Sequence, residues 1–234
     1  MFFGVIFLKK ATFYKELAYF FGIGFIALGV ALAAKAGFGV SMIAGVSYTF
    51  HLWLSQITDI LSLGTIDYLI HGIVILLSGI VTKKFRLSYL FSFITAVFTG
   101  ISIDLFFLIT EPLAAESMVS RIIIFAASIL TCAFGVACIF HAYFSPAGHE
   151  LFVKEFAIHF NKDMGKVKTA YDIVFCFLSV LMNLVLFGGF VGIGIGTVIA
   201  AFTNGPCIGF FDKFLKKHFE FKAAFPKLEK YFEK

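Results

Sequence analysis

The most informative charged side chain in this sequence lies within an apolar stretch. Asp104 is flanked by Ile103 and Leu105, near one end of the stretch 87–109. A carboxylate in hydrocarbon costs about 2.5–3.5 kcal/mol on insertion scales, so it normally faces a bundle interior and has a partner. Lys35, at the end of the first apolar stretch, is the expected partner. This pair is either a substrate or proton site or a structural ion pair, and the sequence leaves both open.

Two further carboxylates lie near the starts of apolar stretches. Asp67 follows the start of one such stretch, and Asp172 closes a capping-box pattern that begins at Thr169. Both positions suit capping, because an acid complements the positive end of a helix dipole. His71 follows Asp67 by one turn on the same face, so Asp67, His71 and Asp172 are also candidates for a proton relay.

Two serines fit the starts of short helices. Ser41 and the pair Ser145-Pro146 have the residue types favoured at the N-cap and in the first turn. A helix N-terminus inside a protein presents free N–H groups that suit an anionic group. Lys35 and His141 lie just upstream of these two breaks. These residues predict a site for an anionic or zwitterionic ligand, although helix capping explains the same pattern.

The last apolar stretch has a polar break of its own. Asn204 lies beside Pro206, which either frees a backbone carbonyl for a ligand or kinks the helix. The glycines at 192, 194 and 196 do not form a dinucleotide site, since no strand precedes them. They suit close helix packing or a loosened helix start that lines a path. No catalytic set and no metal-spaced Cys/His cluster occurs, so we expect neither an enzyme nor a metal or cofactor site.

Composition indicates which elements position these residues. The chain is 60% apolar and 14% charged, with a mean hydropathy of +0.98, which is typical of a membrane protein. A span needs about 20 mostly apolar residues. The predicted spans are 17–34, 66–82, 87–109, 122–141, 170–187 and 190–211. The net charge of +5 comes from residues beside these spans, so we expect contact with membrane lipids and no binding to nucleic acid.

The basic residues predict the orientation of the chain. With six crossings, every Lys and Arg except Lys35 and Arg121 lies on one side of the membrane. Basic residues beside spans accumulate on the cytoplasmic face, so both termini are expected in the cytoplasm. The expected location is the cytoplasmic membrane. A crossing at 40–57 would break this pattern, so we expect a re-entrant or interfacial helix there and another at 147–160. The basic tail 212–234 is expected to lie on the lipid surface.

A weak internal repeat predicts the architecture. Gly-Val-Ala occurs at 29–31 and again at 135–137, and Asp67 aligns with Asp172 in the same order of elements. The fold class is therefore an all-α membrane protein: a leading segment 1–16, then a domain over 17–211. Its halves, 17–109 and 122–211, each hold three spans and a short helix, so the second half inserts inverted. Inverted repeats place a shared site near the midplane.

Two segments carry a resemblance to a known family. The stretch AKAGFGVS at 34–41, Asp67, and GFVGIGIGTVIAAFTNGP at 189–206 resemble the YczE/YitT-type family of bacterial integral membrane proteins. The chain departs from that pattern at Met42 and Ala44, where the family has a proline and an acid. The resemblance implies a multi-span bacterial membrane protein without an established substrate.

The function that these features predict is a permease for a small solute, working by alternating access. Its expected central site comprises Lys35, Asp104, His141 and Asn204. The alternatives are a substrate-capture subunit of a multi-component transporter and a non-transporting accessory or scaffold protein. We expect a small-molecule substrate, and either a homo-oligomer or another membrane partner.

Overall fold

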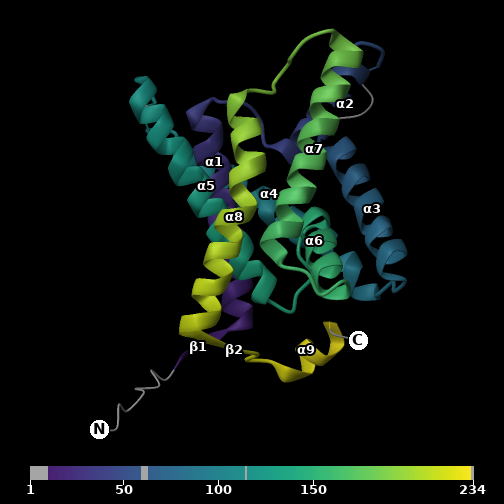
Figure 1. The fold of residues 1–234 in the computed structure, drawn as a ribbon, viewed down its shortest axis with the longest axis vertical. Coiled ribbons are helices and arrows are strands. Elements are labelled where there is room, and N and C mark those ends of the chain that lie inside the picture. Colours follow the sequence, from purple (N-terminus) through teal and green to yellow (C-terminus); the bar gives the residue numbers. More distant parts are fainter. Residues whose placement is uncertain (1–9, 59–62, 114, 233–234) are drawn as a thin grey trace.

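The computed structural model describes residues 10–58, 63–113 and 115–232, most of which are helical (Figure 1). The helices are α1 (Lys15–Ala36), α2 (Met42–Leu54), α3 (Leu63–Thr82), the 3-10 turn η1 (Leu87–Leu90) with α4 (Phe91–Ile109), α5 (Met118–His141), α6 (Gly148–His159), α7 (Met164–Phe187), α8 (Ile195–His218) and α9 (Pro226–Phe232). Two short strands, β1 (Ala11–Tyr14) and β2 (Phe219–Lys222), precede and follow α1 to α8 in the sequence.

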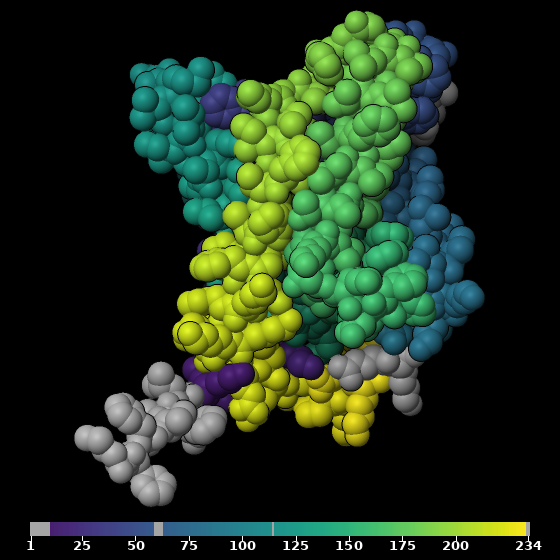
Figure 2. Space-filling view, in the orientation of Figure 1, coloured from purple at the N-terminus to yellow at the C-terminus, as the bar shows by residue number. Residues whose placement is uncertain are grey.

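Within the described residues, five helices are long and apolar enough to cross a membrane. They are α1, α3, η1 with α4, α5 and α7, and their mean hydropathy lies between 1.8 and 2.6. Each coincides with a predicted span, which confirms an integral membrane protein. The sixth predicted span corresponds to α8, which has 24 residues but is less apolar because Thr203, Asn204 and Asp212 interrupt it. Figure 2 shows α7 and α8 running side by side along one face.

The centre of the body is the crossing of α1 and α5, which pack along most of their length. Glycines permit this approach: a Cβ on Gly135 would lie 2.7 Å from the carbonyl oxygen of Gly22. Around this pair, α4 packs on α1 and α8 packs on α5, while α7 contacts both α2 and α8. Helix α3 packs mainly on α6 and has few contacts with α4.

The two short helices occupy the segments expected at 40–57 and 147–160. Helix α2 has 13 residues and α6 has 12, which gives lengths of about 20 Å and about 18 Å, well short of a bilayer core. Helix α6 differs from a helix lying on a lipid surface, because Leu151, Val153 and Ala157 are buried against neighbouring helices. Its polar residue Glu150 faces the interior of the body and not solvent.

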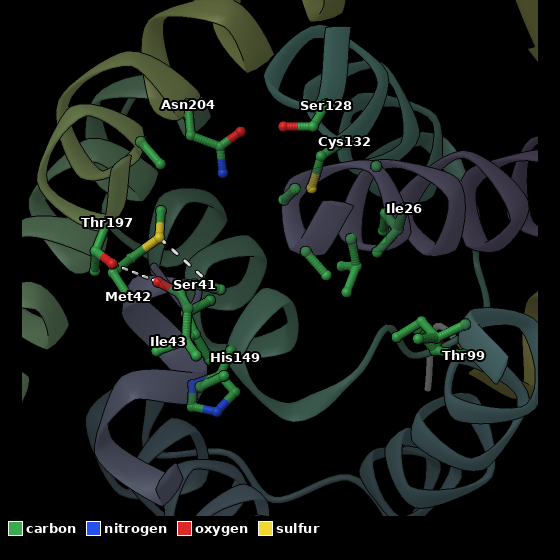
Figure 3. A pocket seen from close by; sticks show the side chains of 18 of the residues that line it. Ile26, Ser41, Met42, Ile43, Thr99, Ser128, Cys132, His149, Thr197 and Asn204 are labelled. Atoms are coloured by element: carbon green, nitrogen blue, oxygen red, sulfur yellow. Dashed lines mark hydrogen bonds between the residues drawn. The ribbon is translucent and has the colours of Figure 1, made fainter. Parts of the chain in front are cut away.

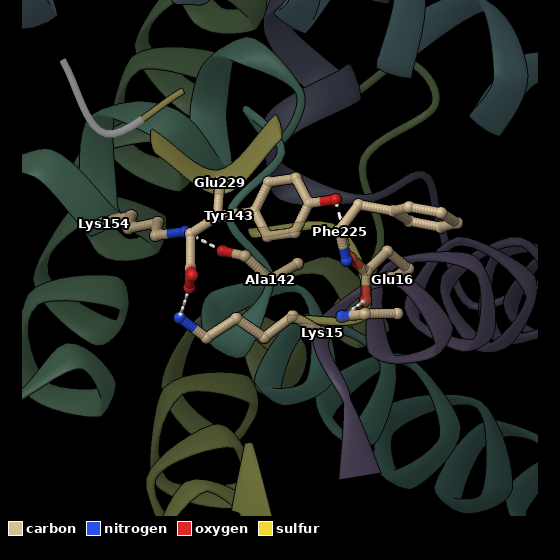
Figure 4. Close-up of polar contacts among 8 residues, drawn as sticks. Lys15, Glu16, Ala142, Tyr143, Lys154, Phe225 and Glu229 are labelled. Atoms are coloured by element: carbon tan, nitrogen blue, oxygen red, sulfur yellow. Dashed lines mark hydrogen bonds and ion pairs between the residues drawn. The ribbon is translucent and has the colours of Figure 1, made fainter. Parts of the chain in front are cut away.

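The segment after α8 folds back against the start of α1. Strand β2 pairs in parallel with β1, with Ala11 opposite Phe219 and Tyr14 opposite Lys222. The Glu16 carboxylate accepts hydrogen bonds from Tyr143 Oη (2.8 Å) and from the N–H groups of Ala224 (3.0 Å) and Phe225 (2.9 Å) (Figure 4). Lys15 pairs with Glu229 on α9. Sequence reasoning predicted neither the strand pair nor this docking onto protein.

Candidate functional site

A cavity of about 740 Å³ lies inside the helical body (Figure 3). Residues of α1, α2, α3, α4, α5, α6, α7 and α8 line it, so both halves of the chain contribute. The wall formed by α1 and α5 is largely apolar, with Ile26, Val30, Phe125 and Ile129. The wall formed by α3, α6 and α7 holds the side chains of Asp67, His71, His149, Glu150 and Lys168.

The first polar group on this wall is built around Asp67 on α3. Ser47 Oγ donates to Asp67 Oδ1 at 2.6 Å, and His71 Nε2 lies 3.4 Å from Asp67 Oδ2. The Gly148 N–H donates to His71 Nδ1 at 3.1 Å. Because Nδ1 accepts this bond, the Nε2 of His71 is the nitrogen that presents an N–H toward Asp67. The start of α6 therefore fixes which tautomer faces Asp67.

His149 on α6 continues this group. Its ring lies 4.6 Å from the His71 ring, centroid to centroid, and its Nδ1 is 2.6 Å from Tyr171 Oη. Burial lowers the pKa of His149 well below its ordinary value, and the neighbouring Lys168 ammonium lowers it further, so the ring is neutral. The side chain is 1% exposed, and its Nε2 has no hydrogen-bond partner among the described residues.

The second polar group centres on Lys168 of α7, which is 1% exposed. Its Nζ lies 2.7 Å from Asp172 Oδ1, one turn along the same helix, and 3.6 Å from Glu150 Oε1 on α6. Asn204 on α8 points its Nδ2 at Asp172 Oδ2, at 3.5 Å. The Oδ1 of Asn204 is buried with no partner in the described part of the chain. Ion pairs therefore connect α6 with α7, and a hydrogen bond connects α7 with α8.

The non-helical segment after α1, which includes Phe38 and Val40, contacts the glycine-containing segment 192–197 at the start of α8. Val40 donates its N–H to the Gly192 carbonyl (3.0 Å), and the Gly196 N–H donates to the Phe38 carbonyl (2.9 Å). Thr197 Oγ1 donates to the Val40 carbonyl at 2.6 Å. A Cβ on Gly194 would collide with the Phe38 carbonyl oxygen, so glycine is needed there. The two segments that carry the family resemblance are thus hydrogen-bonded to each other.

Several of the predicted site residues are brought together by the structure. Ser41, Asp67, His71 and Asn204 line the cavity, and Asp172 lies directly behind Lys168 and Asn204. Ser41 precedes α2 as expected, but its hydroxyl points to Met42 Sδ (3.8 Å) and does not cap the helix.

The other predicted site residues lie outside the cavity. Lys35 Nζ donates to the Glu111 carbonyl at 2.9 Å. Asp104 is exposed on α4 and has no hydrogen bond or ion pair with any residue that the structure describes, so the expected Lys35–Asp104 pair is not formed. His141 Nε2 lies 3.0 Å from Asp212 Oδ1, and Ser145 Oγ donates to the Ser88 carbonyl at 2.7 Å.

Two capping expectations are corrected. Helix α7 begins at Met164, where Asp163 accepts from the Lys166 N–H (3.0 Å), so Asp172 lies more than two turns inside the helix. Thr169 bonds to the Gly165 carbonyl instead of capping. The residue at the N-cap of α6 is Ala147, two residues after Ser145.

Four residues of the polar wall were missed: His149, Glu150, Lys168 and Tyr171. By its position Lys168 is one of the basic residues beside a predicted span, and Glu150 lies in the segment 147–160, where a re-entrant or interfacial helix was expected. The spacing of Lys168 and Asp172 was the available signal, because residues four apart share a helix face. Among the described residues, no group of three or more His, Cys, Asp or Glu side chains is arranged to hold a metal ion.

Comparisons with known proteins identify the family. A family model described as a family of unknown function, DUF6198, matches residues 13–213. The uncharacterized protein YyaS of Bacillus subtilis is 26% identical over 212 residues, which cover 88% of this chain and 96% of the relative. No solved structure matches the chain. The match does not carry the YczE/YitT name, which stays an expectation. With most of its length matched, including all of the cavity, the chain belongs to the DUF6198 family of unknown function.

Proposed function

We propose that this protein is a six-span transporter of a small solute, with the cavity as its central site. The β1–β2 pair supports the six-span topology, and the cavity lined by both halves of the chain supports a solute site. Because the two strands are hydrogen-bonded, they lie on the same side of the membrane, so the chain between them crosses an even number of times. Five helices qualify as spans by length and apolarity, and α8, long and packed against α7, supplies the sixth crossing.

The basic residues favour a cytoplasmic position for that shared side. The last turn of α8 contains Lys216, Lys217 and His218, and Lys222 follows in β2. Positive charges beside spans accumulate on the cytoplasmic face. We therefore place β1, β2 and α9 in the cytoplasm, with the body in the cytoplasmic membrane.

The packing of the helices supports two inverted repeats. Exchanging α1 with α5, α2 with α6, α3 with α7 and α4 with α8 maps the main contacts onto one another. The α1–α4 contact becomes α5–α8, α2–α7 becomes α6–α3, and α1–α5 maps onto itself. A two-fold axis through the α1–α5 crossing would produce this pattern, and the cavity lies beside that crossing.

One pair of helices breaks the pattern in the way that alternating access requires. Helices α7 and α8 pack closely, whereas their counterparts α3 and α4 have few contacts. Both α3 and α4 line the cavity, through residues that include Tyr68, His71, Thr99 and Ile103. Closing α3 on α4 while α7 separates from α8 would give the mirror state of a two-state carrier.

The test is uptake of labelled amines, amino acids and organic acids into vesicles that contain the purified protein. We expect protein-dependent uptake of at least one class, lost in Asn204→Leu and retained in Asp104→Asn, the matched change outside the cavity. Uptake that is lost in Asp104→Asn and kept in Asn204→Leu would refute the cavity as the site. Binding without uptake of any class would favour the substrate-capture subunit, and neither binding nor uptake would favour the accessory protein.

A further inference from the structure

The charges on the cavity wall do not balance. The buried cluster holds two carboxylates, Glu150 and Asp172, and one ammonium, Lys168. Asp67 adds a third carboxylate, whose Oδ1 accepts from Ser47 and whose Oδ2 lies 3.4 Å from His71 Nε2. No other Asp, Glu, Lys or Arg of the described chain lines the cavity. Among the Asp, Glu, Lys and Arg side chains on the wall and directly behind it, carboxylates thus outnumber the ammonium three to one, and unpaired charge is costly where burial limits its solvation.

Two acceptors on this wall are available to a ligand, the Asn204 Oδ1 and the Glu150 carboxylate. The Nδ2 of Asn204 faces Asp172, which leaves its buried Oδ1 without a partner among the described residues. The Glu150 carboxylate lies 3.6 Å from Lys168 Nζ, beyond hydrogen-bond distance, while Lys168 is held at 2.7 Å by Asp172. An amide oxygen and a carboxylate oxygen are groups that a protonated amine satisfies.

The remainder of the cavity suits a carbon body. Helices α1 and α5 contribute Ile26, Val30, Phe125 and Ile129, and the volume of about 740 Å³ lies in the range of small-molecule sites. A bare divalent cation fits less well, because the described residues contain no set of three or more potential metal ligands at one place.

We propose that the cavity binds a small organic ammonium ion, its N–H groups directed at Glu150 and Asn204 and its apolar part against α1 and α5. This narrows the solute class and rests on the proposed function for the movement of the ligand, though not for its binding. It replaces the expected anionic class, because Lys35 and His141, the basic groups expected to attract an anion, do not line the cavity.

The test compares three probes that share one carbon chain: n-hexylamine, 1-hexanol and hexanoate. Binding is measured at pH 7.5 by calorimetry and by thermal stabilisation of the detergent-purified protein. Hexylammonium should bind saturably and raise the melting temperature, and the other two should not. Glu150→Gln should weaken hexylammonium binding about tenfold or more, the loss expected for a charge-assisted hydrogen bond. Glu155→Gln is the matched control, since Glu155 lies on the same helix but pairs with Arg86 outside this cavity.

Each result bears on the assignment. Stronger binding of hexanoate, or equal binding of hexanol and hexylammonium that Glu150→Gln leaves unchanged, would overturn it. If Glu150→Gln does not fold, Asn204→Leu should show the same preferential loss of hexylammonium binding. Hexylammonium binding without protein-dependent uptake into vesicles would refute the transport proposal and leave this one standing. Uptake of another solute with no hexylammonium binding would refute the ammonium site and leave the transport proposal standing.

Discussion

Replacing Lys168 by Met removes the only ammonium from the buried cluster at nearly constant volume. Two unit charges 2.7 Å apart, as Lys168 Nζ and Asp172 Oδ1 are, attract by about 6 kcal/mol at an effective dielectric constant of about 20. Part of this is offset, because the variant no longer has to desolvate the ammonium. Breaking a buried pair on one side costs about 3–5 kcal/mol in other proteins.

Proton uptake sets an upper limit on this loss. The stranded Asp172 can bind a proton, and neutralising a carboxyl with an ordinary pKa of about 3.9 at pH 7 costs about 4 kcal/mol. We therefore expect Lys168→Met to lower the free energy of unfolding by about 3–4 kcal/mol at pH 7. Since protonation becomes easier by about 1.4 kcal/mol per pH unit, the difference from the unmodified protein should fall to about 1.5 kcal/mol at pH 5.

Unfolding by titration with SDS, at pH 7 and at pH 5, measures both values. Lys166→Met is the matched control, because Lys166 is exposed on the same helix and should change the stability by less than about 0.5 kcal/mol. The double variant Lys168→Met/Asp172→Leu should recover most of the loss, since an apolar pair of similar volume often replaces a buried ion pair without cost. A loss below about 1 kcal/mol at pH 7, or one that does not shrink at pH 5, would refute a stranded carboxylate.

Two further predictions concern the glycine break and the buried imidazole. Gly194→Ala should lower stability by about 1–3 kcal/mol in thermal unfolding, because the added Cβ forces the Phe38 segment to move, whereas Gly189→Ala meets no atom within 4 Å and should be neutral. Equal effects of the two changes would contradict the close approach. The lowered pKa of His149 means that its contribution to stability is complete above the unfolded pKa of about 6.5 and is lost as the pH falls below it, by up to about 1.4 kcal/mol per unit. His149→Phe should flatten this acid limb of the stability curve and His218→Phe, at an exposed site, should not; an unchanged limb in His149→Phe would rule out His149 as its source.

The spans were predictable because their signal is local. About 20 apolar residues in a row specify a membrane helix whatever surrounds them, so five predicted spans coincide with helices of the structure. The short helices at 42–54 and 148–159 were also placed correctly along the chain. Charge patterning argued against a crossing at 40–57, and the segment 147–160 lies at the matching place in the second half.

The polar wall was not predictable in the same way. Lys168 lies near the start of α7, where a lysine usually contacts lipid headgroups, and its burial depends on α6 packing against α7. The pairing of Asp104 with Lys35 was expected from their positions at neighbouring helix ends, but tertiary packing takes Lys35 to the Glu111 carbonyl. The strand pair joins segments far apart in sequence. The sequence signal for β2 was the alternation of Phe219 and Phe221 with Glu220 and Lys222, which is the pattern of a half-buried strand.

The β1–β2 pair also sets an order for biosynthesis. Strand β1 and the start of α1 leave the ribosome first, whereas their partners Phe219–Lys222, Ala224, Phe225 and Glu229 are made last. The Glu16 carboxylate therefore cannot form its hydrogen bonds with the N–H groups of Ala224 and Phe225 until nearly the whole body has been inserted. Nascent chains arrested before residue 219 should hold α1 against α5 but leave the residue 11–16 segment open to proteases, so closure of this end becomes a late checkpoint of assembly.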